Sequence, residues 1–193
     1  MTPAPAPGPQ ALVFVVITVL LDVIGFSLIV PVLPALLMDL TGQGVNQVAV
    51  HGGWLAFAYA AAQFLCAPVL GNLSDRFGRR PVLLAAVGTL GVDYIIMGLA
   101  PTLSWLFLGR TLAGMAGASF TPAYAYVADI SPPEKRAQNF SMIGAAFGLG
   151  FILGPAVGGL LGEFGPRTPF FVAAGLSALN LAYGLLVLPE TLS

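Results

Sequence analysis

Long apolar stretches alternate along this chain with short segments that are polar or rich in glycine and proline. A transmembrane helix needs about 20 mostly apolar residues. Six stretches meet that length, and they predict membrane-spanning helices over residues 11–37, 53–73, 81–100, 103–128, 140–161 and 169–188. The short alternating strands of a membrane β-barrel are not seen. The predicted fold class is therefore an all-α integral membrane protein, a bundle of six helices whose longest connection is 38–52.

The composition supports a membrane protein and excludes several other classes. Of 193 residues, 58% are hydrophobic and only 8% are charged, whereas soluble domains carry about 25% charged residues. Disordered chains combine low hydrophobicity with high charge, and a net charge of −1 gives no field that would attract nucleic acid. No catalytic Ser/His/Asp set, metal-ligand cluster or phosphate-binding loop is found, so we expect neither an enzyme nor a resident metal or cofactor.

The ends and the basic residues predict how the chain lies in the membrane. Residues 1–10 are rich in proline and alanine and predict a disordered lead, while 189–193 would begin a linker. The connections after the second and fourth helices hold five basic residues, and the opposite side holds only Arg167. Because cytoplasmic loops are enriched in Lys and Arg, we expect both termini to be cytoplasmic.

Three ionisable residues fall inside predicted spans: Asp22, Asp93 and Arg110. Charge in hydrocarbon is costly, so such residues are functional candidates, although they can also pair and simply hold helices together. Asp22 lies near mid-depth, which suits a group that gains and loses a proton. We expect Asp22 and Arg110 to face a concave side formed by the first, second, fourth and fifth spans, with the third and sixth spans further away.

Further polar positions accompany these charges. A stripe on the fourth span, spaced for one helix face, contains Arg110, Gly114, Gly117, Thr121 and Tyr124. We expect its glycines to pack against another helix. We expect its polar side chains, Arg110, Thr121 and Tyr124, to face water and to line a cavity for the proton and the substrate. Gln63 on the second span either joins this polar site or bonds a neighbouring helix.

Two cytoplasmic segments combine acids with bases. The segment 71–80 (GNLSDRFGRR) contains Gly71, Asp75, Arg76, Gly78, Arg79 and Arg80, and the fourth span is followed by Asp129 and Arg136. A positive-inside anchor explains the arginines but not the acids and glycines. We predict a breakable latch in which Asp129 lies near Arg76 or Arg79, and Asp75 lies near the segment after the fourth span or the end of the fifth. Gly78 permits a tight reversal.

The fifth span carries a dense glycine and proline pattern: Gly150, Gly154, Pro155, Gly158 and Gly159. Glycines four residues apart permit close helix contact, and a proline inside a helix favours a kink. The pattern indicates a packing face, a bend, or both.

Together these motifs resemble the N-terminal six-helix half of the major facilitator superfamily. The segment 71–80 is similar to that family's motif between its second and third helices, the Arg110 stripe to its fourth-helix motif, and 150–159 to its antiporter motif. Residues 20–37 (LLDVIGFSLIVPVLPALL), 74–84, Asp93 with Tyr94, and 147–171 resemble the bacterial tetracycline efflux transporters more narrowly.

The resemblance implies export of a drug such as a tetracycline–Mg²⁺ chelate against protons across the bacterial inner membrane. Mg²⁺ would enter only as part of the substrate. Asp22, Gln63, Asp93 and Arg110 would lie at or near the polar cavity. The family's second six helices are missing, so the expected partner is a second six-helix bundle or a parallel copy of this chain. A metabolite transporter and a non-transporting membrane subunit remain alternatives.

Overall fold

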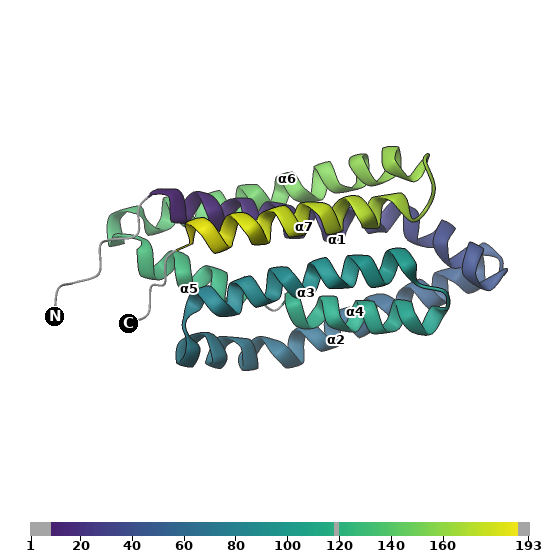
Figure 1. Ribbon diagram of the computed structural model, residues 1–193, viewed down its shortest axis with the longest axis horizontal. Helices are drawn as coiled ribbons and strands as arrows, with labels where there is room; N and C mark the ends of the chain where they lie inside the picture. The colour runs from purple at the N-terminus through teal and green to yellow at the C-terminus, as the bar shows by residue number, and fades with distance from the viewer. Residues whose placement is uncertain (1–8, 118–119, 189–193) are drawn as a thin grey trace.

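The computed structural model describes residues 9–117 and 120–188, which form a bundle of helices without any β-strand in those ranges. The elements are α1 (Pro9–Thr41), α2 (Val45–Phe77), α3 (Arg79–Leu99), α4 (Leu103–Gly117), α5 (Phe120–Ile130), the short 3₁₀-helix η1 (Pro133–Lys135), α6 (Arg136–Gly162) and α7 (Thr168–Val187). They run roughly along one long axis (Figure 1). The predicted all-α fold class is confirmed.

Among the described residues, five helices are long and apolar enough to cross a membrane: α1, α2, α3, α6 and α7. The described residues of the predicted fourth span, 103–128, belong to α4 and α5, and residues 118–119 between them lie outside the described residues. Figure 1 shows α4 followed by α5 along the bundle axis. The predicted fourth span is therefore helical in all of its described residues.

The prediction of a long connection over 38–52 is wrong. α1 continues to Thr41 and α2 begins at Val45, so only Gly42, Gln43 and Gly44 separate them. Hydropathy locates the part of a helix that lies in lipid, but a helix can extend into water with polar residues on its surface. Residues 9–10 of the predicted disordered lead belong to α1 instead. Residues 1–8 and the predicted linker start 189–193 lie outside the described residues.

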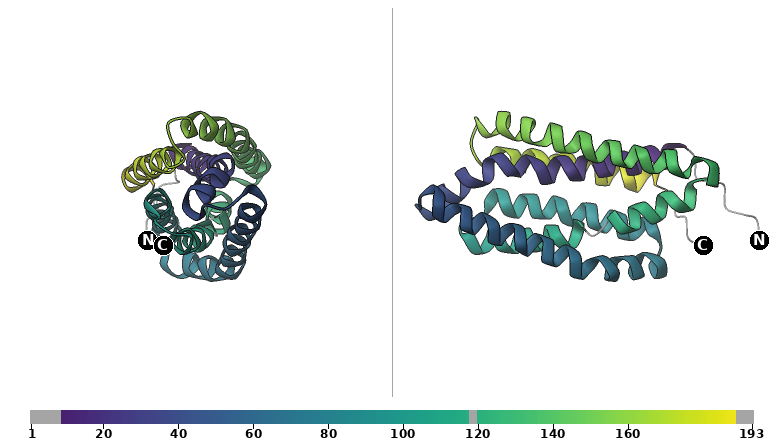
Figure 2. Two further views of the ribbon diagram at one scale, coloured as in Figure 1. Left: turned by 90° about the vertical axis from the view of Figure 1, so that its right-hand side faces the viewer. Right: turned by 180° about the vertical axis from the view of Figure 1, so that it is seen from behind.

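The ends of the helices sort into two groups. The start of α1, the α2–α3 and α5–α6 connections, and the end of α7 lie at one end of the bundle (Figures 1 and 2). The five basic residues of the predicted cytoplasmic connections therefore share that end, and Arg167 at the start of α7 lies at the other. This is the distribution from which the positive-inside rule predicts cytoplasmic termini.

α1 contacts every other α-helix and packs most extensively against α6. The glycine pattern of α6 forms this contact. A Cβ added at Gly150 would lie 2.7 Å from Val23, one at Gly154 would collide with Ser27, and one at Gly158 would collide with the Leu28 backbone. The Ser27 hydroxyl also donates a hydrogen bond to the Gly150 carbonyl at 2.9 Å. The predicted packing face is confirmed.

Gly159 and Pro155 of that motif are different from the three packed glycines. Gly159 has open space around it, and α6 runs unbroken through Pro155. The predicted bend at Pro155 stays a prediction.

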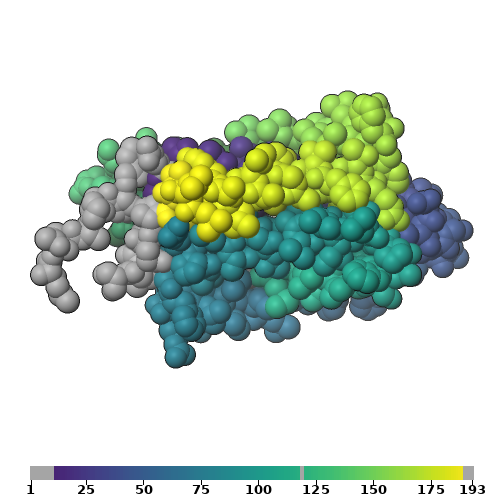
Figure 3. All heavy atoms as spheres, in the orientation of Figure 1, coloured from purple at the N-terminus to yellow at the C-terminus, as the bar shows by residue number. Residues whose placement is uncertain are grey.

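The helices differ in how much of their surface the bundle covers. In the apolar windows of α1 and α3, 50% and 56% of residues are buried, but in those of α6 and α2 only 22% and 11% are. Figure 3 shows a face on which α7 (yellow) and α3 (teal) pack closely together. The uncovered apolar surface is therefore concentrated on α2 and α6.

Candidate functional site

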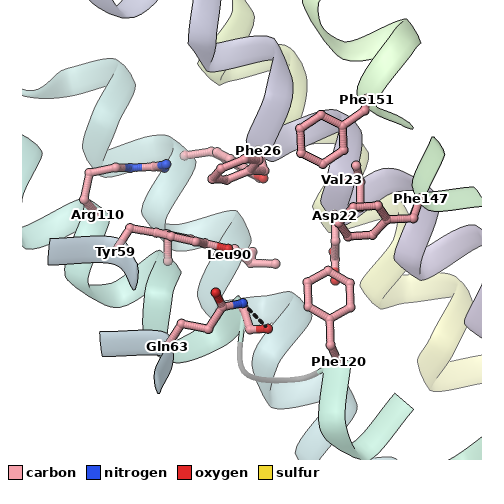
Figure 4. Close-up of a pocket in the computed structure, with 13 residues that line it drawn as sticks. Asp22, Val23, Phe26, Tyr59, Gln63, Leu90, Arg110, Phe120, Phe147 and Phe151 are labelled. Carbon is pink, nitrogen blue, oxygen red and sulfur yellow. Dashed lines mark hydrogen bonds between the residues drawn. The ribbon is translucent and has the colours of Figure 1, made fainter. Parts of the chain in front are cut away.

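A cavity of about 190 Å³ lies inside the bundle (Figure 4). It is lined by residues from six helices: Asp22, Val23, Phe26, Tyr59, Gln63, Leu90, Tyr94, Arg110, Ala113, Gly117, Phe120, Phe147 and Phe151. The buried apolar residues of the bundle form two clusters. Val23 belongs to one of them, and Leu90, Tyr94 and Ala113 belong to the other. The cavity therefore lies between the two halves of the core, near the middle of the bundle.

The buried arginine of the cavity is neutralised by an acid from the neighbouring helix. Arg110 on α4 donates from Nη2 to Asp93 Oδ2 on α3 at 2.9 Å, and their side chains are 6% and 0% exposed. Gly109 makes room for this pair, because a Cβ there would lie 2.6 Å from Asp93 Oδ1. Asp93 Oδ1 and Arg110 Nε are buried without a hydrogen-bond partner. The pairing interpretation thus holds for Asp93 and Arg110, although Arg110 also reaches the cavity wall.

Asp22 contributes a carboxylate to the same cavity from α1. Within the described part of the chain it forms no ion pair. Gln63 on α2 also faces the cavity, and its amide nitrogen donates to the Gly117 carbonyl on α4 at 3.1 Å. Asp22, Gln63 and Arg110 therefore share one cavity, and Gln63 both lines it and bonds a neighbouring helix.

Thr121 and Tyr124 do not line this cavity, contrary to the prediction. Thr121 is exposed and faces Gly71 on α2, where an added Cβ would lie 3.6 Å from its methyl group. Tyr124 is 43% exposed and packs its ring 5.8 Å from that of Phe140. Both residues lie on α5, whereas Arg110, Gly114 and Gly117 lie on α4.

Among the other expectations about the helices around the cavity, the structure confirms the packing of the fourth-span glycines and contradicts the position of the third span. Gly114 and Gly117 do pack against α2, at Tyr59. The expectation that the third span lies away from the cavity is wrong, because α3 contributes Leu90 and Tyr94. α7 contributes no lining residue among those described.

The sequence did not predict the aromatic wall of the cavity. Six of the thirteen lining side chains are aromatic, compared with 10% of the whole chain. The signal in the sequence was weak, because these rings are distributed over five helices. Only two local spacings hint at it: Phe26 follows Asp22 by one helical turn, and Phe151 follows Phe147 by one turn.

A second polar cluster lies at the end of the bundle that carries the basic residues. Arg79 forms ion pairs with Asp75, four residues earlier, and with Asp129 on α5 at 3.2 Å. It also donates to the Ser74 hydroxyl at 3.0 Å. The predicted proximity of Asp129 to Arg79 is confirmed. Asp75, however, pairs with an arginine of its own segment, because the reversal at Gly78 (φ +102°) returns Arg79 alongside it.

Three other basic residues of this end contact backbone or aromatic groups. Arg80 donates to the Leu185 carbonyl near the end of α7 at 2.8 Å. Arg136 donates to the Ser131 carbonyl at 3.3 Å. The Arg76 guanidinium lies 5.4 Å from the centre of the Phe77 ring. The cluster therefore joins α2, α3 and α5 through Arg79, and α3 to α7 through Arg80.

Over the described ranges, no group of three or more His, Cys, Asp or Glu side chains could hold a metal ion.

Comparisons with known proteins agree with this architecture. The sequence model of the Major Facilitator Superfamily matches residues 15–193. The chain is 48% identical over 182 residues to the class C tetracycline resistance protein of Escherichia coli, covering 94% of this chain and 46% of that protein. It is 32% identical over 189 residues to multidrug resistance protein 2 of Bacillus subtilis, covering 95% and 46%.

A solved structure shares the fold. The crystal structure of the human organic anion transporter MFSD10 (TETRAN) superposes with a TM-score of 0.82 at 28% sequence identity, over 96% of this chain and 49% of that one. The chain thus spans about half the length of the relatives it matches.

Proposed function

This chain belongs to the Major Facilitator Superfamily, and on that premise we propose that it forms the N-terminal half of a proton-coupled drug exporter of the bacterial inner membrane. The proposed substrate is a drug such as a tetracycline–Mg²⁺ chelate, with Mg²⁺ carried as part of the substrate. The observation that supports this most strongly is the cavity shared by Asp22, Gln63 and Arg110. Ionisable groups at membrane depth mark transport pathways, because their burial is otherwise costly.

The size of the cavity argues that this half supplies only part of the substrate site. Its volume is about 190 Å³, and pockets for drug-sized ligands usually hold about 300–1,000 Å³. A second bundle would supply the remaining wall, and rocking of the two bundles around a midplane site would give alternating access. The apolar faces of α2 and α6 are the least covered and suit that contact.

Asp22 is the residue to which we assign the proton. Arg110 already has its counter-ion in Asp93, whereas Asp22 has no ion-pair partner among the described residues. An unpaired carboxylate at this depth is stabilised by protonation. A carboxylate that binds a proton in one state and releases it in another is what antiport against protons requires.

The Arg79 cluster is the proposed cytoplasmic gate. Arg79 joins the α2–α3 reversal to α5 through Asp75 and Asp129. The two acids are 63% and 38% exposed at their side chains, and exposed ion pairs contribute only about 0–1 kcal/mol each. Pairs of this strength can be broken in each cycle, yet they bias two conformations of similar free energy.

Drug accumulation in cells tests the proposal. Tetracycline uptake is measured in cells that express this chain alone, or together with the second half of the class C relative. We expect accumulation to fall only with the second half and to recover when a protonophore is added. Asp22→Asn should abolish this efflux, while Glu163→Gln, an exposed acid at the other end of the bundle, should not.

The same experiment separates the alternatives. Efflux by the chain alone would indicate a parallel dimer, in agreement with the parallel relation of the two halves in this fold. Normal insertion without efflux in any combination would refute the transport proposal and favour a non-transporting subunit.

A further inference from the structure

We propose that the hydroxyl of Tyr94 on α3 donates a hydrogen bond to Asp22 on α1 when that carboxyl is ionised, and so governs the pH at which Asp22 releases its proton. The inference rests on the proposed function, because that function assigns the transported proton to Asp22. It depends on the position of the Tyr94 hydroxyl against α1 and on the partners of the other polar groups around the cavity.

Tyr94 reaches α1 at a glycine that lies close to Asp22. A Cβ added at Gly25 would collide with the Tyr94 hydroxyl, so the hydroxyl occupies the space that a side chain would take there. Residues three apart on a helix are neighbours, with about 5–6 Å between their Cβ atoms. The hydroxyl therefore lies beside Asp22 on the same face of α1, and both residues line the cavity (Figure 4).

The Tyr94 hydroxyl is a donor without an acceptor in this arrangement. Tyr94 is only 2% exposed, and among the described residues its hydroxyl forms no hydrogen bond. A buried tyrosine hydroxyl usually finds a partner, because an unmade hydrogen bond costs the desolvation of the group. Asp22 is the only carboxylate among the described residues that line the cavity, and it too has no partner among them.

The other polar groups around the cavity contact different partners. On α4, Arg110 is held by Asp93 of α3. A Cβ added at Gly117 would lie 2.6 Å from the Tyr59 hydroxyl and 3.2 Å from the Gln63 amide nitrogen, so both donors of α2 lie against α4. In the described lining, α5 and α6 contribute only phenylalanine rings and α7 contributes no side chain. The hydroxyl on α3 is therefore the donor best placed to serve the α1 carboxyl.

A hydrogen bond from Tyr94 would act on the proton through the charged form of Asp22. A donor that bonds to a carboxylate favours ionisation, and hydrogen bonds to charged groups are about twice as strong as those between neutral groups. Asp22 would then release its proton at a lower pH with the bond than without it. A small movement between α1 and α3 that breaks the bond would make Asp22 hold its proton, which links proton release to helix position.

Carbodiimide labelling of the full chain in lipid nanodiscs tests the contact. Dicyclohexylcarbodiimide adds to protonated carboxyls in apolar surroundings and remains attached as an N-acylurea, and peptide mass spectrometry assigns the adduct to Asp22. The extent of labelling after a fixed time, measured across acidic, neutral and alkaline pH, gives the midpoint at which Asp22 loses its proton. We expect Tyr94→Phe to move this midpoint up by about one to two pH units.

Two further variants and a control assign the shift to this contact. Gly25→Ala perturbs it from α1, because the added methyl group displaces the Tyr94 hydroxyl, and it should move the midpoint in the same direction. The double variant should move no further than Tyr94→Phe alone, since the hydroxyl is lost only once. Tyr183 on α7 packs its ring 5.7 Å from that of Phe14 on α1, and Tyr183→Phe, which also removes one hydroxyl, should leave the midpoint unchanged. Circular dichroism checks that each variant is folded.

Three results would overturn the contact: an unchanged midpoint in Tyr94→Phe, a larger shift in Tyr59→Phe than in Tyr94→Phe, or shifts of Gly25→Ala and Tyr94→Phe that simply add in the double variant. Each leaves the efflux proposal standing if Asp22→Asn still abolishes tetracycline export. Conversely, the expected shifts without efflux in any combination of halves would support the contact and refute the exporter.

Discussion

The ion pair between Asp93 and Arg110 gives the sharpest test of how this bundle is stabilised. Replacing Asp93 with leucine keeps a side chain of similar size but leaves the Arg110 guanidinium, 6% exposed, without a counter-ion. At an effective dielectric constant of 20, unit charges 2.9 Å apart attract by about 6 kcal/mol. Desolvation offsets much of this attraction, and removing one member of a buried pair usually costs about 3–5 kcal/mol.

A double-mutant cycle isolates the pair from the rest of the bundle. Asp93→Leu and Arg110→Met should each lower the free energy of unfolding by about 3–5 kcal/mol. The double variant leaves no buried charge, so we expect it to lie within about 1–2 kcal/mol of the original chain. Detergent unfolding followed by the fluorescence of Trp54 and Trp105 measures these values. Glu163→Gln, at an exposed position, is the control.

Additivity would refute this reasoning. If the losses of the two single variants simply sum in the double variant, the coupling between Asp93 and Arg110 is absent and the pair does not account for their burial. A strong coupling together with lost efflux in the stable double variant would separate the structural role of the pair from its role in transport.

Three further predictions concern packing, the gate and topology. Gly158→Ala should lower stability by about 1–3 kcal/mol through overpacking against the α1 backbone, while Gly159→Ala, with open space around it, should not; thermal unfolding of the two variants side by side decides this. Asp75→Asn should cost under about 1 kcal/mol of stability yet reduce efflux in the assembled transporter, so full efflux in that variant would contradict the gate. Cysteines introduced at Gln43 and Phe77 should react with impermeant reagents from outside and from inside, respectively, and the reverse pattern would overturn the predicted orientation.

Hydropathy alone was enough to predict the helical bundle, for a simple physical reason. A backbone in hydrocarbon must satisfy its hydrogen bonds within its own segment, so each long apolar stretch has to become a helix. The cost of charge in lipid likewise singled out Asp22, Asp93 and Arg110 before any contact was known. The glycines of α6 were recognisable because their spacing by itself creates a smooth helix face.

Tertiary structure decided which of these groups meet. Nothing local to Arg110 says that Asp93 rather than Asp22 neutralises it; the packing of α3 against α4 does. The rings from Tyr59 to Phe120 come from four helices and converge only when the bundle forms. Helix periodicity describes one helix at a time, whereas the position of a helix beside its neighbours is set by close packing of many side chains. For that reason the sequence predicted the charges of the cavity, but only the assembled bundle determined its aromatic wall.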